Sequence, residues 1–256
     1  MTMLLASVRS AAEARQALAG GADIIDLKEP AAGALGRLPD ATIREILRAV
    51  DGRRPTSATI GDMELSPPRV LEAVRDMAAA GVDIVKFGVF AGDAPGTLAA
   101  LAAPACSGLR LVAVLFADRD PDFDLIDRCG DAGLYGIMLD TADKRAGPLT
   151  THLGRAALAR FVQRGRDKGL LTGLAGSLSV RDVPDLLTLS PDYLGFRSAL
   201  ATGGRTGELD PAAVVRLRAL LDARSSSSAT AAAGAQSAAR ADTFSSAAAT
   251  TVSNPR

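Results

Sequence analysis

Short apolar runs alternate along this chain with longer, alanine-rich segments of mixed polarity. The runs follow one another at intervals of roughly 20 to 35 residues, which accommodates one strand, one helix and two loops. In chain order they are MLLASV, DIIDLK, TSATI, DIVKFG, RLVAVLF, YGIMLD, LLTGLAG and DYLGFRS. Eight strands that alternate with helices predict a parallel sheet, and right-handed crossovers would close it into a single (β/α)8 TIM barrel of the α/β class.

The helical segments have recognisable ends. Ser10, with Glu13 three residues later, predicts a capping box at a helix start, and Gly20 suits the end of that helix. Ser66, followed by two prolines, predicts the start of another helix that stops before Gly81. The alternative fold is a doubly wound open sheet, but the glycine-rich first turn typical of that fold is missing.

The composition changes near the C-terminus. From Ser225 onward alanine, serine and threonine dominate, and Phe244 is the only aromatic residue. Such a segment has little apolar area with which to offset the entropy of ordering it. We therefore expect a catalytic barrel over residues 1–223 and a disordered tail over residues 224–256.

Several classes of function are excluded by composition. The formal net charge is zero and no basic stripe stands out, so nucleic acid is not expected as a partner. No apolar run is long enough for a membrane span or a signal peptide, which predicts a cytoplasmic protein with no membrane partner. Cys106 and Cys129 are too few for a disulfide framework, and His152 is the only histidine, so we expect no metal site. Nucleotide-binding glycine motifs are missing as well, and we expect no cofactor; whether the protein forms a homo-oligomer is left open.

The lysines carry the clearest chemical signal. The chain contains 25 arginines but only four lysines, and a guanidinium cannot deprotonate to form an imine or accept a proton. Three of these lysines, Lys28, Lys86 and Lys144, fall at or just after the ends of predicted strands. Asp26 precedes Lys28 by two residues and therefore shares its face of the strand, and Asp140 ends the sixth strand in the same way.

The C-terminal ends of barrel strands all face the active site. We therefore expect these three amines and two carboxylates to share one mouth. One lysine, kept neutral by nearby positive charges, could form a Schiff base with a carbonyl substrate. A neighbouring amine or carboxylate could then move protons at the adjacent carbon.

The last two loops predict what the site holds. Loops after strands seven and eight frequently bind phosphate in such barrels, and a helix start after Ser177 would add N-terminal amides. The loop SATIGD after strand three offers Ser57, Thr59 and Asp62 as polar contacts, or it is an ordinary turn. The phosphate or substrate candidates are Gly176, Ser177, Arg197, Ser198 and Thr59. Whether Arg205 is a second phosphate contact is left open by the sequence.

The stretches GGADIIDLKEPAAGALG, SATIGD, VKFG, LDTADK and LAGSL resemble the (5-formylfuran-3-yl)methyl phosphate synthase family over roughly residues 4–221. The resemblance implies a TIM-barrel lyase that condenses two molecules of glyceraldehyde 3-phosphate to the furan aldehyde phosphate, with loss of phosphate and water. It implies a place in methanofuran-type cofactor biosynthesis and one-carbon metabolism. By motif it implies Lys28 as the Schiff-base residue and Lys86 as the proton acceptor, supported by Asp26, Asp140 and Lys144.

Two further readings stay open. A class I aldolase or a triose-phosphate isomerase-like enzyme could use the same barrel, because the fold alone does not fix the reaction. A non-catalytic sugar-phosphate-binding protein would need the phosphate loops but not Lys28 or Lys86. Full function after Lys28→Arg would favour this last reading.

Overall fold

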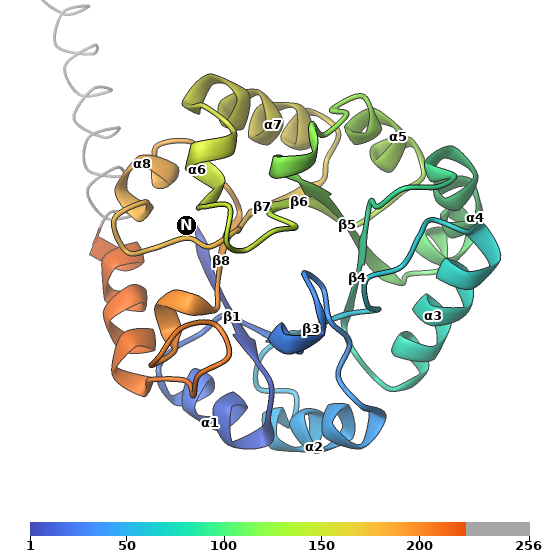
Figure 1. The fold of residues 1–256 in the computed structure, drawn as a ribbon. Coiled ribbons are helices and arrows are strands. Elements are labelled where there is room, and N and C mark those ends of the chain that lie inside the picture. Colours follow the sequence, from blue (N-terminus) through green and yellow to red (C-terminus); the bar gives the residue numbers. More distant parts are fainter. Residues whose placement is uncertain (224–256) are drawn as a thin grey trace, which may run out of the picture.

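Eight parallel strands pair in sequence order, and the eighth pairs with the first, so the sheet closes into a barrel (Figure 1). The computed structural model describes residues 1–223 of the chain. Every apolar run predicted as a strand contains one, which confirms the TIM-barrel prediction. The strands are β1 (Met3–Val8), β2 (Ile24–Leu27), β3 (Thr56–Thr59), β4 (Ile84–Gly88), β5 (Arg110–Phe116), β6 (Gly136–Asp140), β7 (Leu171–Leu174) and β8 (Tyr193–Phe196).

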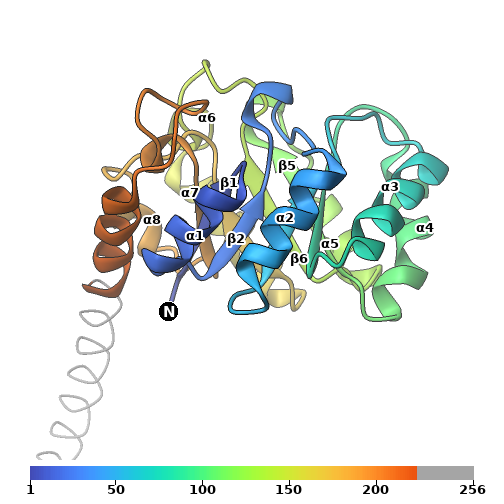
Figure 2. The ribbon, with the colours of Figure 1, turned by 90° about the horizontal axis from the view of Figure 1, so that it is seen from below.

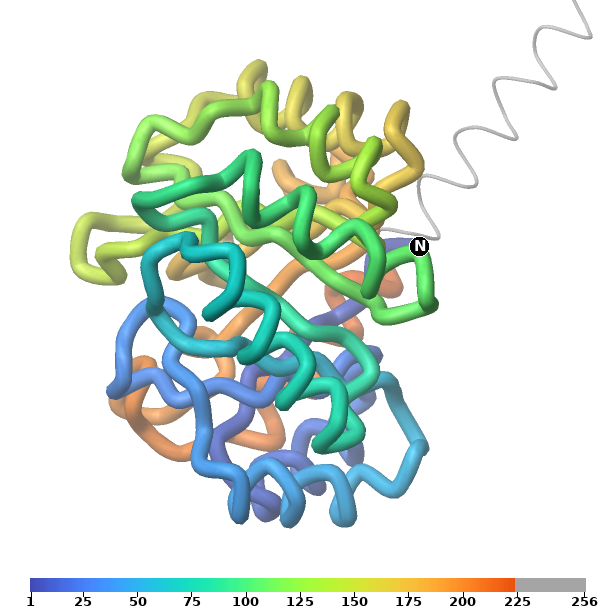
Figure 3. Tube along the Cα trace, turned by 90° about the vertical axis from the view of Figure 1, so that its right-hand side faces the viewer, coloured from blue at the N-terminus to red at the C-terminus, as the bar shows by residue number. Residues whose placement is uncertain are grey.

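Helices form a ring around this barrel, as the end-on view of Figure 1 and the trace of Figure 3 show. A further helix over residues 211–223 ends the described part of the chain. The α-helices with printed bounds are α1 (Ala11–Ala19), α2 (Asp40–Val50), α3 (Pro67–Ala79), α4 (Ala94–Cys106), α5 (Leu125–Asp131), α6 (Leu149–His152), α7 (Arg155–Asp167) and α8 (Val183–Leu187). Short 3-10 helices are η1 (Pro30–Ala32), η2 (Ala117–Arg119) and η3 (Ser198–Leu200).

The predicted helix starts are largely confirmed. The Ser10 hydroxyl accepts a hydrogen bond from the Glu13 N–H at 3.2 Å, and α3 begins directly after Ser66. Only half of the predicted capping box forms, however. The Glu13 carboxylate accepts from the Arg9 N–H at 2.9 Å and pairs with Arg197 instead of turning back to Ser10. The buried ion pair with Arg197 takes the place of the local bond.

Alternation along the strands separates two layers of core. Ile25 and Leu27 on β2 pack outward under the helices, whereas Ile24 points into the barrel with residues of the inner cluster. Met138 on β6 points inward in the same way. Because successive side chains of a strand alternate, Asp26 and Asp140 are carried inward above these apolar residues.

The side view of Figure 2 places the loops that follow the strands at one end of the barrel. The loop after β2, which contains η1, lies across that mouth in Figure 1. The Asp62 carboxylate accepts from the N–H groups of Ala34 at 2.8 Å and Leu35 at 2.6 Å. These two hydrogen bonds fasten the β2 loop to the β3 loop.

Some predictions concern features that the structure describes only in part. The tail predicted for residues 224–256 lies outside the described residues, so that division of the chain stays a prediction. Within residues 1–223, Cys106 is exposed and Cys129 is buried, and both are free thiols. The same range contains no group of His, Cys, Asp and Glu side chains suited to a metal ion. None of its helices is long and apolar enough to cross a membrane.

Candidate active site

Asp26 lies in the deepest polar layer of the barrel. The pairing of parallel strands places Ser7 of β1 and Ser57 of β3 level with it on either side. Their hydroxyls donate to the two carboxylate oxygens at 2.8 and 2.7 Å, and Lys86 Nζ lies 2.5 Å from Oδ1. All four side chains are buried. A charge removed from water is tolerated when it is paired and fully hydrogen-bonded, and this network meets both conditions.

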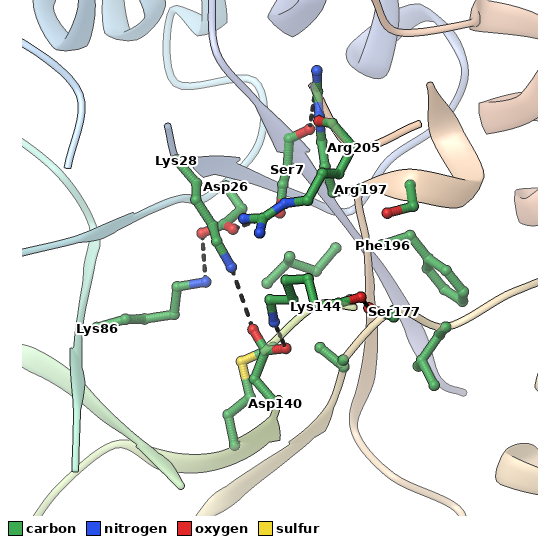
Figure 4. Close-up of a pocket in the computed structure, with 17 residues that line it drawn as sticks. Ser7, Asp26, Lys28, Lys86, Asp140, Lys144, Ser177, Phe196, Arg197 and Arg205 are labelled. Carbon is green, nitrogen blue, oxygen red and sulfur yellow. Dashed lines mark hydrogen bonds and ion pairs between the residues drawn. The ribbon is translucent and has the colours of Figure 1, made fainter. Parts of the chain in front are cut away.

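Asp140 gathers the other two lysines on the opposite side of the mouth (Figure 4). Lys28 Nζ donates to Oδ2 at 3.3 Å, whereas Lys144 Nζ forms a short hydrogen bond to Oδ1. The Thr141 N–H donates to Oδ1 at 2.8 Å, and the Thr141 hydroxyl lies 3.4 Å from Lys144 Nζ. Lys28 therefore has the longest and least supported ion pair of the three amines.

The two carboxyl groups stay ionised. Burial opposes the charge on Asp26, but the ammonium groups of Lys86 and Lys28 outweigh it and lower the pKa of that carboxyl below its usual value. Burial likewise opposes the charge on Asp140, and Lys144 and Lys28 again lower its pKa. Both groups act as fixed negative charges at neutral pH.

Two of the three lysine amines have a pKa below that of an ordinary lysine. Burial lowers the pKa of Lys86, and the partial compensation by Asp26 does not restore it. Burial also lowers the pKa of Lys144 to about 8, with Asp140 opposing the shift. A lysine with a lowered pKa can act as a base or as a nucleophile near neutral pH, which an ordinary surface lysine cannot.

One cavity connects these groups with the last two loops. Its walls include all three lysines, both aspartates, the β7 loop and the β8 loop. Nine of the sequence-predicted site residues line it, namely Asp26, Lys28, Lys86, Asp140, Lys144, Gly176, Ser177, Arg197 and Ser198. The chain thus brings its catalytic candidates and its phosphate-loop candidates to a single opening.

Thr59 is placed elsewhere. Its side chain is completely buried and its hydroxyl donates to the Gly36 carbonyl at 3.0 Å, which ties β3 to the β2 loop. It is not among the residues that line the cavity. Of the two other residues predicted in this loop, Ser57 donates a hydrogen bond to Asp26, and Asp62 accepts hydrogen bonds from the β2 loop.

The β7 loop differs from its expected form. No helix starts directly after Ser177. The next helix, α8, begins at Val183, and the carboxylate of its N-cap residue Asp182 already accepts a hydrogen bond from the Ser179 N–H at 2.8 Å. Gly176 and Ser177 instead form a tight turn with φ angles of +104° and +49°. A Cβ on Gly176 would lie 3.0 Å from the Thr141 nitrogen, so glycine lets this turn approach the Asp140 strand end.

Sequence reasoning missed Ser7 and left Arg205 undecided, yet both line the cavity. Ser7 follows Leu5 by two residues on β1, so strand alternation alone could have placed it inward. Arg205 lies in an irregular segment, where no periodicity signals the direction of a side chain.

Solved structures similar to this chain share its barrel. Phosphoribosyl anthranilate isomerase from Thermus thermophilus superposes with a TM-score of 0.61 at 15% identity, covering 87% of this chain and 99% of that one. Thiamine phosphate pyrophosphorylase from Pyrococcus furiosus gives 0.60 at 12% identity, covering 86% and 95%. At such identities the likeness concerns the fold alone.

Sequence relatives are more informative. A protein of Methylorubrum extorquens, named as a candidate (5-formylfuran-3-yl)methyl phosphate synthase, is 44% identical over 214 residues, covering 83% of this chain and 89% of the relative. The (5-formylfuran-3-yl)methyl phosphate synthase of Archaeoglobus fulgidus is 35% identical over 227 residues, covering 84% and 97%. Residues 4–218 match the family described as 4-HFC-P synthase. The chain therefore belongs to the 4-HFC-P synthase family.

Proposed function

We propose that this protein is a lyase that makes (5-formylfuran-3-yl)methyl phosphate from two molecules of glyceraldehyde 3-phosphate. The observation that carries the proposal is the sharing of two buried carboxylates by three lysines at one cavity. Loss of one phosphate and two molecules of water balances the reaction. The family membership supports this product and a place in methanofuran-type cofactor biosynthesis.

Lys28 is the proposed nucleophile. Its amine would attack a triose-phosphate carbonyl, and loss of water from the carbinolamine would leave an imine. The 3.3 Å hydrogen bond to Asp140 is the longest amine–carboxylate contact among the three site lysines. We therefore expect the Lys28 amine to leave its carboxylate partner most easily when a substrate binds. Lys144 shares the same carboxylate, so Lys28 does not hold Asp140 alone.

Lys86 is the proposed proton acceptor. A proton on the carbon next to the imine becomes acidic, and its removal gives an enamine that can attack the aldehyde of the second triose. Burial favours the neutral amine of Lys86, while Asp26 holds its position at 2.5 Å. Asp26 itself would stay ionised and would stabilise the ammonium that forms.

The phosphate of the substrate is proposed to lie against the β7 and β8 loops. The cavity wall there includes Gly176, Ser177 and Ser198. The Ser177 hydroxyl bonds the Lys144 carbonyl at 3.2 Å, which links the phosphate side of the cavity to the amine side. A triose phosphate would thereby span the distance from these loops to Lys28.

Incubation with glyceraldehyde 3-phosphate tests the proposal. We expect a rise in ultraviolet absorbance from the furan aldehyde together with released inorganic phosphate. A class I aldolase would join carbon atoms without releasing phosphate, an isomerase would give dihydroxyacetone phosphate, and a sugar-phosphate-binding protein would give no product. Lys168→Arg is the matched control, because Lys168 pairs with Asp131 on the outer helices and lies outside the cavity.

A further inference from the structure

Arg197 borders the cavity, but its guanidinium is fully occupied by protein acceptors. Nε donates to the Arg205 carbonyl at 2.7 Å, and Nη1 donates to the Ser7 carbonyl at 3.1 Å and to Glu13 at 2.6 Å. Nη2 donates to Glu13 at 3.1 Å and to the Gly207 carbonyl at 2.5 Å. A guanidinium has five N–H donors, so none remains for a phosphate unless a bond to the protein breaks.

Glu13 shows that this arrangement is built into the fold. It is 5% exposed, on α1, and its carboxylate also accepts from the N–H groups of Arg9 at 2.9 Å and Leu209 at 3.2 Å. Burial opposes its charge, but the hydrogen bond and charge of Arg197 lower its pKa. The bonds to the Arg205 and Gly207 carbonyls and from the Leu209 N–H fasten the segment from 205 to 209 to this pair, and the Ser7 carbonyl ties the pair to β1.

These contacts determine the position of Arg205. Its backbone is held by Arg197, while its half-buried side chain lines the cavity and reaches toward Lys28 in Figure 4. One guanidinium N–H donates to the Gly33 carbonyl at 2.9 Å, across the mouth on the β2 loop. Within residues 1–223 its other donors make no further hydrogen bond. A guanidinium with donors facing a cavity suits bidentate recognition of a phosphate.

We propose that Arg205 is the residue that binds the substrate phosphate, and that Arg197, paired with Glu13, is a positioning residue that never contacts it. The proposal rests on the proposed function, in that a phosphorylated substrate enters this cavity. It assigns recognition of the phosphate charge to the irregular segment after η3, which carries Arg205, and not to Arg197 at the end of β8.

Calorimetric binding of glycerol 3-phosphate tests the assignment without any covalent step, since this probe lacks a carbonyl. We expect Arg205→Ala to weaken binding about 10- to 100-fold, as for lost hydrogen bonds to a charged group. Its melting temperature should stay near that of the wild type, because only the bond to Gly33 is lost. Arg145→Ala is the control: its side chain is 95% exposed in the β6 loop, and its removal should leave binding unchanged.

Arg197 is tested by a double-mutant cycle. Arg197→Lys keeps the charge that Glu13 needs but cannot keep the bonds to both Arg205 and Gly207. We expect it to weaken binding of glycerol 3-phosphate in the wild-type background and to have no effect in the Arg205→Ala background. Additive effects of the two substitutions would show an independent phosphate contact by Arg197 and would overturn its positioning role.

The outcomes separate this inference from the proposed function. If the wild-type protein binds glycerol 3-phosphate and Arg205→Ala binds it equally well, the assignment of Arg205 is wrong and the proposed function stands. If the wild-type protein does not bind glycerol 3-phosphate at millimolar concentration and also releases no phosphate from glyceraldehyde 3-phosphate, both fail together.

Discussion

The two carboxylates of the cavity have the same chemistry but different surroundings. Asp26 is held entirely by residues of strands, with serines of the two neighbouring strands level with it and the fully buried Lys86 of β4 beside it. Asp140 holds one lysine from the end of another strand and one from a loop, and both lysine side chains are about one-tenth exposed. The barrel thus contains one fully buried ion pair, Asp26 with Lys86, and one partly exposed cluster, Asp140 with Lys28 and Lys144.

The loop that carries Lys144 in the partly exposed cluster is held by hydrogen bonds to the loop after β5. The Asp118 carboxylate accepts from the N–H groups of Ala142 and Asp143, both at 2.7 Å, which holds the segment that carries Lys144. The comparison teaches that the two proposed roles differ in exposure. Lys86, on β4, is buried among the strands, which suits an internal proton acceptor, whereas Lys28, directly after β2, is partly exposed, which suits attack on a substrate carbonyl.

The largest expected effect is on the partly exposed cluster. Lys28→Arg should abolish both turnover and the adduct trapped by borohydride with glyceraldehyde 3-phosphate, a loss of about 10⁴-fold or more, because a guanidinium cannot form the imine. Mass spectrometry of the reduced protein measures the adduct, and Lys168→Arg should behave as the wild type. Recovery of the adduct on Lys144 or Lys86 would transfer the nucleophile's role to that residue.

The next effect separates the two regions directly. Lys86→Met should lower turnover by roughly 10²- to 10⁴-fold while borohydride still traps the adduct on Lys28, since a general base is lost and the nucleophile is kept. The Asp26→Asn and Lys86→Met double variant serves as a control for folding, because it leaves no unpaired buried charge. Loss of trapping in a folded double variant would contradict a purely proton-accepting Lys86.

A third prediction compares the carboxylates through stability. Asp26→Asn leaves Lys86 buried without a counter-charge, and we expect the free energy of unfolding to fall by about 3–5 kcal/mol. Asp140→Asn leaves two amines that water in the cavity can reach, and roughly 1–2 kcal/mol should be lost. Urea denaturation at pH 7 measures both, and equal losses would show that the difference in burial between the two regions has no effect on stability.

The smallest effect is a pH dependence at Lys144. Its pKa is about 8 in the folded protein and 10.5 in an ordinary lysine, so between these values the unfolded chain binds more protons at this site. Stability therefore rises with pH across that window. Relative to Lys144→Met, the wild type should gain about 2 kcal/mol in free energy of unfolding between pH 7 and pH 10. A pH-independent difference between the two proteins would show that Lys144 has an ordinary pKa.

Much of the site could be predicted from the sequence. The spacing of Asp26 and Lys28, and the match of Asp140 with Met138, follow from alternation along a strand, and the barrel topology then gathers all strand ends. Thr59, Ser177 and Arg197 were harder to place, because each belongs to a turn or strand end. There, side-chain direction depends on partners far along the chain, such as Gly36 for Thr59.

The sequence by itself determined the eight-stranded barrel, the inward register of its polar residues and the concentration of scarce lysines at one mouth. Only the tertiary structure decided which amine pairs with which carboxylate, and that Arg197 turns to Glu13 while Arg205 enters the cavity. The physical reason is separation along the chain. The Lys28–Asp140 contact joins residues 112 positions apart, and the Arg197–Glu13 contact joins residues 184 apart. Local periodicity fixes the face of a strand, whereas such contacts depend on strand register and packing across the closed barrel.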